Sequence, residues 1–222
     1  MPNPIKPNFK TEWFACCLII ISFLSGLYFY QHFPDRVPTH WSIGGEVNGY
    51  SGPFVAAFAI PLMTIGLYLL FLFLPYFDPK KERYQEFAKT YHLFKSLIVL
   101  FMALIYLATG LFNIGYPINI GVTTSLGVGA LFIIIGNYLG KIKYNWFVGI
   151  RTPWTMSSEN VWNKTHRVGG WLFVTLGIIM MIIPHLPESL AIPIFILGIV
   201  VVVAGSFGYS YWLFRQERKI EK

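Results

Sequence analysis

Charge is scarce in this sequence. Only 12% of the 222 residues are Asp, Glu, Lys or Arg, whereas about 25% is usual in soluble domains. Hydrophobic residues account for 55% of the chain, and several apolar runs exceed the roughly 18 residues that distinguish a membrane span from a buried core helix. This composition excludes an ordinary soluble enzyme and a disordered chain. It predicts an all-α integral membrane protein without a separate soluble domain of the usual size.

Cysteine is also scarce. The only two cysteines, Cys16 and Cys17, are adjacent in the first apolar run. Neighbouring cysteines rarely pair, and the chain offers no other partner, which excludes a disulfide framework and a cysteine-based zinc site. We interpret both as small buried residues of a helix.

Six apolar segments predict six transmembrane helices, with bounds at about 13–30, 54–76, 94–113, 118–139, 170–183 and 190–214. No small-residue cleavage site follows the first segment, which is therefore expected to be an uncleaved anchor. The fifth segment is short for a full crossing, so we expect it to borrow a turn or more from the preceding residues.

The distribution of basic residues predicts the orientation. With a cytoplasmic N-terminus, sixteen of the 17 lysines and arginines fall on the cytoplasmic side, and only Arg36 falls outside. Because basic loops stay on the cytoplasmic side, both termini are expected there. The net charge of +7 is then explained by the basic residues that set the topology, and no direct binding of nucleic acid is needed to explain it. We expect a multi-pass membrane protein, surrounded by the lipid bilayer.

The same pattern gives the expected domain organisation. The parts are a cytoplasmic N-terminal tail at 1–12, a two-helix membrane unit at 13–76 with an extracytoplasmic loop at 33–53, a basic cytoplasmic linker at 77–93, a four-helix membrane unit at 94–214 with a cytoplasmic loop at 141–169, and a basic C-terminal tail at 215–222.

The central parts of the predicted spans lack ionisable side chains altogether. Such residues mark ion pathways and proton relays, so their absence argues against an ion-coupled transporter, although not against a passive route for an apolar molecule. Small residues recur at four-residue spacing, in Gly136–Gly140 and in Ala204–Gly208. This spacing permits close helix packing, either inside the bundle or between two copies, and it leaves the oligomeric state open.

The outer loop, residues 33–53, is too long to be a simple connection. Its prolines exclude a helix, residues 40–43 suggest a short strand, and Gly44–Gly45 suggests a two-residue hairpin turn. Asp35, His40 and Glu46 are too few and too irregularly spaced for a metal signature, so we expect no metal site. The loop is either a packed cap over the helix ends or a surface that contacts a ligand or peptide.

The inner loop, residues 141–169, is basic and rich in tryptophan. Ser157 or Ser158 is a plausible N-cap for a helix that places Trp162 and His166 on one face and leads into the fifth span along the membrane interface. We interpret His166 as a hydrogen-bonding residue, because no nucleophile motif accompanies it and catalysis needs such a partner. The sequence therefore predicts no catalytic residue, no cofactor and no enzyme activity.

The inner loop resembles the signature of the SdpI family, bacterial membrane proteins that confer immunity to the sporulation-delaying toxin. The matching positions are Asn145, Gly149, Arg151, Thr152, Pro153, Trp154, Thr155, Trp162, His166 and Arg167. The outer loop is similar to an element of an uncharacterised N-terminal domain often fused to that family. Its matching positions are Pro38, His40, Trp41, Gly45 and Tyr50.

The resemblance implies an immunity protein of the bacterial cytoplasmic (inner) membrane that resists a secreted hydrophobic peptide toxin. The two-sided arrangement of the loops is compatible with this, because the structured outer loop could meet the toxin. It also implies a sensor that sequesters a small DNA-binding autorepressor at the membrane. In that case Arg151 and Arg167 would contact lipid phosphate or an acidic partner. Two other functions stay open, a small-molecule or peptide exporter and a membrane-embedded lipid-modifying enzyme.

Overall fold

The structure is a computed structural model that describes residues 3–42 and 45–220. Within this part of the chain, six helices are long and apolar enough to cross a membrane, as the sequence predicted. The elements in chain order are α1 (Phe9–His32), β1 (Val37–Trp41), β2 (Val47–Ser51), α2 (Pro53–Phe77), the 3₁₀ helix η1 (Lys81–Phe87), α3 (Ala88–Asn113), α4 (Ile120–Leu139), α5 (Glu159–Ile182), the 3₁₀ helix η2 (Ile183–His185) and α6 (Glu188–Ile220).

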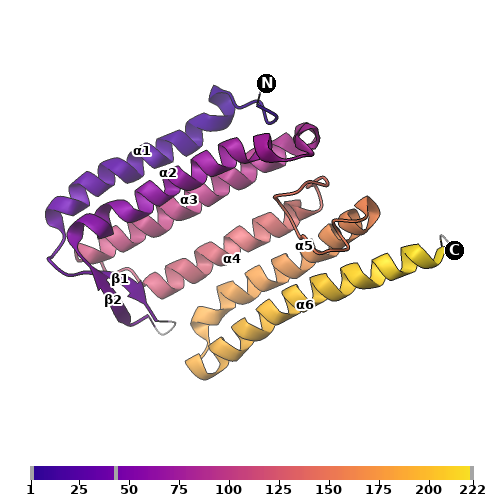
Figure 1. The fold of residues 1–222 in the computed structure, drawn as a ribbon. Helices are drawn as coiled ribbons and strands as arrows, with labels where there is room; N and C mark the ends of the chain where they lie inside the picture. Colours follow the sequence, from indigo (N-terminus) through magenta and orange to yellow (C-terminus); the bar gives the residue numbers. More distant parts are fainter. Residues whose placement is uncertain (1–2, 43–44, 221–222) are drawn as a thin grey trace.

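The helices form two groups that run side by side (Figure 1). Helices α1, α2 and α3 pack on one another, α5 packs between α4 and α6, and α3 meets α4 where the groups join. The β1–β2 hairpin lies at one end of the bundle, the hairpin end. Both termini and the α4–α5 connection, residues 140–158, lie at the opposite end, the loop end (Figure 1).

Helix α5 is longer than its apolar core. It begins at Glu159, eleven residues before the predicted span, and Ser158 is its N-cap, with a side chain that accepts a hydrogen bond from the Val161 N–H. The expectation that this span borrows preceding residues is confirmed. The borrowed turns and the span form one continuous helix, Glu159–Ile182, in place of the separate interfacial helix that the sequence suggested.

Helix α3 also starts early, at Ala88, and η1 precedes it. Most of segment 77–93, expected as a basic linker, is therefore helical. The reason is its aromatic content: Tyr84, Phe87 and Tyr91 are buried in a core that also contains Trp162. Burial of these rings stabilises the helical segment despite the exposed charges between them.

The hairpin exists, but its first strand begins earlier than predicted. Strand β1 starts at Val37 and pairs antiparallel with β2, with Pro38 opposite Tyr50. A two-stranded ribbon has only edge strands, where proline is tolerated. Gly45 adopts a φ of 84° in the connection, while Gly44, the other residue of the predicted turn, lies outside the described residues.

Glycines bring α4 and α5 into close contact. A Cβ atom on Gly136 would lie 2.6 Å from the Gly170 carbonyl oxygen, and one on Gly129 would lie 2.7 Å from the Gly177 carbonyl oxygen. Gly136 therefore serves packing inside the bundle. Ala204 and Gly208 on α6 are exposed, so the association of two copies through that stripe stays a prediction.

Candidate functional site

The inner-loop motif folds around buried polar side chains. Asn145 is fully buried, and its Oδ1 accepts hydrogen bonds from the N–H groups of Phe147 (2.9 Å) and Val148 (2.7 Å). Its amide nitrogen donates to the carbonyl oxygens of Lys143 and Val148. The Asn145 side chain thus supplies hydrogen-bond partners for several backbone groups of a tight turn. Backbone polar groups need such partners when a loop is buried.

This turn is tied to the end of α2 through Asp78, which is 2% exposed. Its Oδ2 accepts hydrogen bonds from the Trp146 N–H (2.9 Å) and from the Tyr84 hydroxyl (2.9 Å). Hydrogen bonds to a carboxylate are stronger than neutral ones. The loop is thereby fixed to the N-terminal half of the chain. Sequence reasoning missed Asp78, because its importance comes only from contact with a segment 68 residues away.

His166 and Trp162 support the next part of the loop. The Ile150 N–H donates to His166 Nε2 at 2.9 Å, so Nε2 is unprotonated and Nδ1–H donates to the Trp162 carbonyl oxygen at 2.8 Å. The two rings stack with centroids 4.0 Å apart, and Trp162 Nε1 donates to the Ile142 carbonyl oxygen. Both side chains are fully buried. His166 is a hydrogen-bonding residue that holds the loop, in agreement with the sequence interpretation.

The Thr-Pro-Trp-Thr segment fixes the loop to α6. Thr152 and Thr155 are buried, and the hydroxyl oxygen of each accepts a hydrogen bond from the backbone N–H of the other. Thr152 also donates to the Ser210 hydroxyl at 3.0 Å, and the Trp154 ring packs on Tyr211 with centroids 5.0 Å apart. The loop therefore contacts both halves of the protein. Pro153, between them, is exposed.

The two arginines of the motif are exposed, unlike its threonines, asparagine and histidine. Arg151 donates to the Trp146 carbonyl oxygen, which holds part of its guanidinium against the loop. Arg167 projects from the third turn of α5, on a different face from the buried Trp162–His166 pair. These two arginines are the charged motif residues that are exposed, and Trp146, outside the predicted motif, is half-exposed beside them.

The outer-loop residues lie together in the hairpin, at the end of the bundle away from this motif (Figure 1). The Pro38 carbonyl oxygen accepts a hydrogen bond from Asn113 of α3 (3.0 Å), and Trp41 packs edge-on against Phe112. His40 bonds to Asn48 across the strands. Tyr50 is 52% exposed. The hairpin is thus docked on α3, with the Trp41 ring packed against the helix and the Tyr50 ring exposed.

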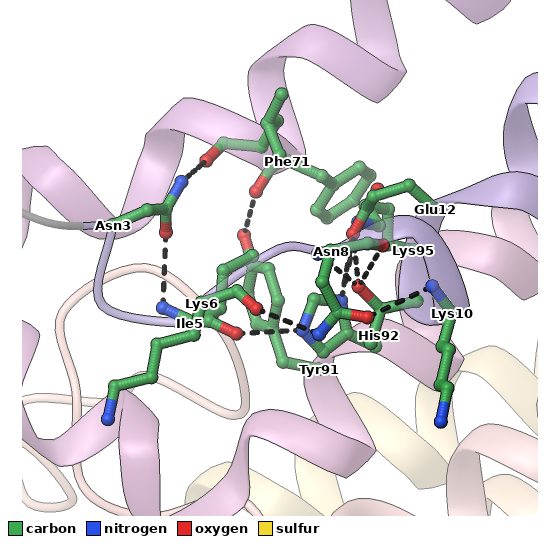
Figure 2. Close-up of polar contacts among 12 residues, drawn as sticks. Asn3, Ile5, Lys6, Asn8, Lys10, Glu12, Phe71, Tyr91, His92 and Lys95 are labelled. Atoms are coloured by element: carbon green, nitrogen blue, oxygen red, sulfur yellow. Dashed lines mark hydrogen bonds and ion pairs between the residues drawn. The ribbon is translucent and has the colours of Figure 1, made fainter.

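A buried ionic cluster joins α1, α2 and α3 near the loop end (Figure 2). Lys95 is fully buried and ion-paired with Glu12. The Tyr68 hydroxyl donates to Glu12 at 2.8 Å, and His92 Nδ1 lies 3.3 Å from the same carboxylate. His92 Nε2 contacts the Ile5 carbonyl oxygen, so it carries the proton and donates. The cluster also orders the N-terminal segment before α1.

Lys95, one of the sixteen basic residues counted on the cytoplasmic side, has a buried side chain, which the sequence did not indicate. The early start of α3 carries Lys95 two turns into the helix, where Glu12 neutralises it. The prediction that both cysteines are buried is wrong. Cys17 is exposed, and Cys16 is half-buried with its Sγ 3.7 Å from the Tyr68 hydroxyl.

Comparison with known proteins matches both motif regions. Residues 141–211 match the family model described as the SdpI/YfhL protein family, and residues 17–65 match the model of a domain of unknown function, DUF1648. The immunity protein SdpI of Bacillus subtilis (strain 168) is 29% identical over 207 residues, which cover 93% of this chain and 97% of that protein. Among solved structures, none matches the chain. The C-terminal part of the chain is therefore similar to the SdpI/YfhL family, and the DUF1648 match precedes that segment.

Proposed function

We propose that this protein is a membrane immunity protein that protects its cell from a secreted peptide toxin. The observation that carries the proposal is the similarity to the immunity protein SdpI along almost the whole chain. Because the similarity spans both motif regions, it extends to the parts most suited to contact other molecules. Similarity to an immunity protein also favours a non-enzymatic role.

The two-ended architecture supports this proposal. The hairpin and the inner-loop motif lie at opposite ends of a bundle of helices long enough to cross a membrane. With the orientation expected from the basic residues, the hairpin faces the outside, where a secreted peptide arrives, and the inner loop faces the cytoplasm. The protein then resides in the cytoplasmic membrane.

A sensing role is the second part of the proposal. The inner loop is bonded to α2 through Asp78 and to α6 through Ser210, so a movement of either helix reaches it. Exposed Arg151 and Arg167 offer a basic surface at the same end. A small cytoplasmic DNA-binding repressor with an acidic patch is the partner that such a surface suits. Allostery of this kind needs two sites and one shared two-state element.

The immunity proposal is tested by a survival assay. The full chain is expressed in a strain that is sensitive to the sporulation-delaying toxin, and survival is measured against peptide dose, beside the empty vector and a strain expressing Bacillus subtilis SdpI. We expect the chain to raise the dose tolerated. Equal killing of cells that carry the vector and cells that contain normal membrane levels of the protein would disprove immunity to this peptide.

The sensing role needs a separate variant. Arg167→Ala removes an exposed charge without touching the buried hydrogen bonds of the loop, while Arg215→Ala removes an exposed charge from α6 as a control. If Arg167 binds a cytoplasmic partner, its loss abolishes retention of a co-expressed repressor at the membrane but leaves toxin survival intact. Retention that is unchanged in the Arg167 variant would remove this residue from the proposal.

A further inference from the structure

A cavity of about 580 Å³ lies beneath the hairpin, between the two halves of the bundle. Trp41 and Ser42 of the hairpin line one side, and Ile105 of α3 lies deeper in the same half. Thr124 of α4 and Phe195 of α6 line it from the other half. Its volume falls within the range of about 300–1,000 Å³ typical of ligand sites. None of the motif interactions of the inner loop uses this cavity.

The cavity is lined mainly by apolar surface, and Trp41, one of its lining residues, carries an unsatisfied donor. The Nε1 atom of Trp41 is buried and has no hydrogen-bond partner, although the ring packs firmly on Phe112. A buried indole N–H normally finds an acceptor, because leaving it unpaired costs about 1–3 kcal/mol. A ligand that brings a carbonyl oxygen against apolar surface would satisfy it.

The charge around the cavity selects the class of ligand. Glu188, in the first turn of α6, lines it, and the hairpin region adds Asp35 and Glu46 against the single basic residue Arg36. The Arg36 guanidinium lies over the Tyr50 ring, with its carbon 4.9 Å from the centroid. The Glu188 carboxylate at the cavity repels a lipid phosphate and attracts an amino group. The cavity therefore fits a peptide better than an anionic lipid.

We propose that this cavity binds an apolar segment of a cationic or neutral peptide, with a backbone carbonyl accepting from Trp41 Nε1 and an amino group facing Glu188. This inference rests on the proposed immunity function and assigns the site where the toxin meets the protein. The halves of the bundle both line the cavity, so an occupant contacts both of them. Because the inner loop is hydrogen-bonded to both halves, binding in the cavity can change the position of that loop.

Photocrosslinking tests the site directly. A photoreactive phenylalanine analogue replaces Phe195, which lines the cavity, or Leu197, which is 62% exposed on the same helix and does not line it. Membranes containing each full-length variant are irradiated with purified sporulation-delaying toxin. We expect a peptide adduct at position 195 and little at position 197. An adduct of lipid mass alone at 195, or equal peptide yields at both positions, would overturn the proposal.

Two further variants and one control variant test whether the cavity is needed for protection. Thr124→Phe fills the cavity, and Thr123→Phe adds the same group at a neighbouring position that does not line it. Trp41→Phe keeps the ring but removes the donor. We expect Thr124→Phe and Trp41→Phe to lower the 195 adduct and the tolerated dose, on the order of tenfold for the filled cavity, and Thr123→Phe to leave both near wild type.

The outcomes separate this inference from the immunity function. If the wild-type chain protects cells while the Thr124 and Trp41 variants protect equally well at matched membrane levels, the cavity proposal fails and immunity stands. If the wild type fails to protect, immunity to this peptide fails, and the adduct at 195 then decides alone whether the cavity binds peptide.

Discussion

Gly149 lies directly against His166. A Cβ atom at position 149 would overlap His166 Nε2 and would lie 3.1 Å from the Trp162 ring, and the backbone there has a φ of 121°. Both facts require glycine: the conformation is unfavourable for other residues, and the space is already occupied by the atom that accepts from Ile150. The glycine of the Gly-x-Arg-Thr-Pro element is therefore a steric requirement of this packing.

Gly149→Ala is expected to destabilise the protein by about 2 kcal/mol or more, because backbone strain and overlap add. The measurement is the thermal unfolding temperature of the purified protein in detergent, together with its membrane level. Gly208→Ala is the control, since a Cβ atom there meets nothing within 4 Å on α6, and alanine favours a helix. Equal stability of the two variants would contradict this account of Gly149.

The sequence predicted the larger features because they depend on composition and periodicity. Six apolar runs sufficed for six helices, and Ser158 with Glu159 marked the start of α5. Long-range partners escaped prediction. Nothing near Asp78 in the sequence indicates that it accepts from Trp146, and nothing near Lys95 shows that Glu12 neutralises it. Such pairs become visible only when packing brings distant segments together.

The motif residues illustrate the same limit. The sequence predicted that Trp162 and His166 share a helix face, and the stacked rings confirm this. It did not predict that Thr152 and Asn145 are buried, because threonine and asparagine in a loop are usually exposed. Much of this dense motif therefore specifies a loop conformation, and Arg151 and Arg167 are the charged members that face outward.

His166→Phe is expected to lower stability by about 1–3 kcal/mol, because the ring still stacks on Trp162 while the Ile150 N–H loses its acceptor. The measurement is resistance to unfolding by denaturing detergent. His185→Phe serves as the control, since His185 is exposed at the other end. A His166 variant as stable as wild type would show that the hydrogen bond contributes little.

The predicted orientation is open to a direct test. Green fluorescent protein fused after residue 222 should fluoresce, because the C-terminus is expected in the cytoplasm. Alkaline phosphatase inserted in the hairpin connection should be active, because that enzyme needs the oxidising exterior. The reverse pattern would invert the assignment of the hairpin and the inner loop to their sides of the membrane.

The ion pair between Lys95 and Glu12 gives a prediction about charge burial (Figure 2). Glu12→Gln leaves the fully buried ammonium of Lys95 without its counter-charge, and loss of one partner from a buried pair typically costs about 3–5 kcal/mol. Lys95→Met leaves the carboxylate, but Tyr68 and His92 still contact it, so we expect a smaller loss.

The double variant Glu12→Gln/Lys95→Met separates pairing from packing. It removes both charges, so it should be more stable than Glu12→Gln alone, because an apolar replacement of a buried pair is often nearly neutral. Unfolding by denaturing detergent, measured for all four proteins, gives the coupling energy. If the double variant is as unstable as the sum of the two single variants, Lys95 and Glu12 contribute independently and the cluster does not act as a pair.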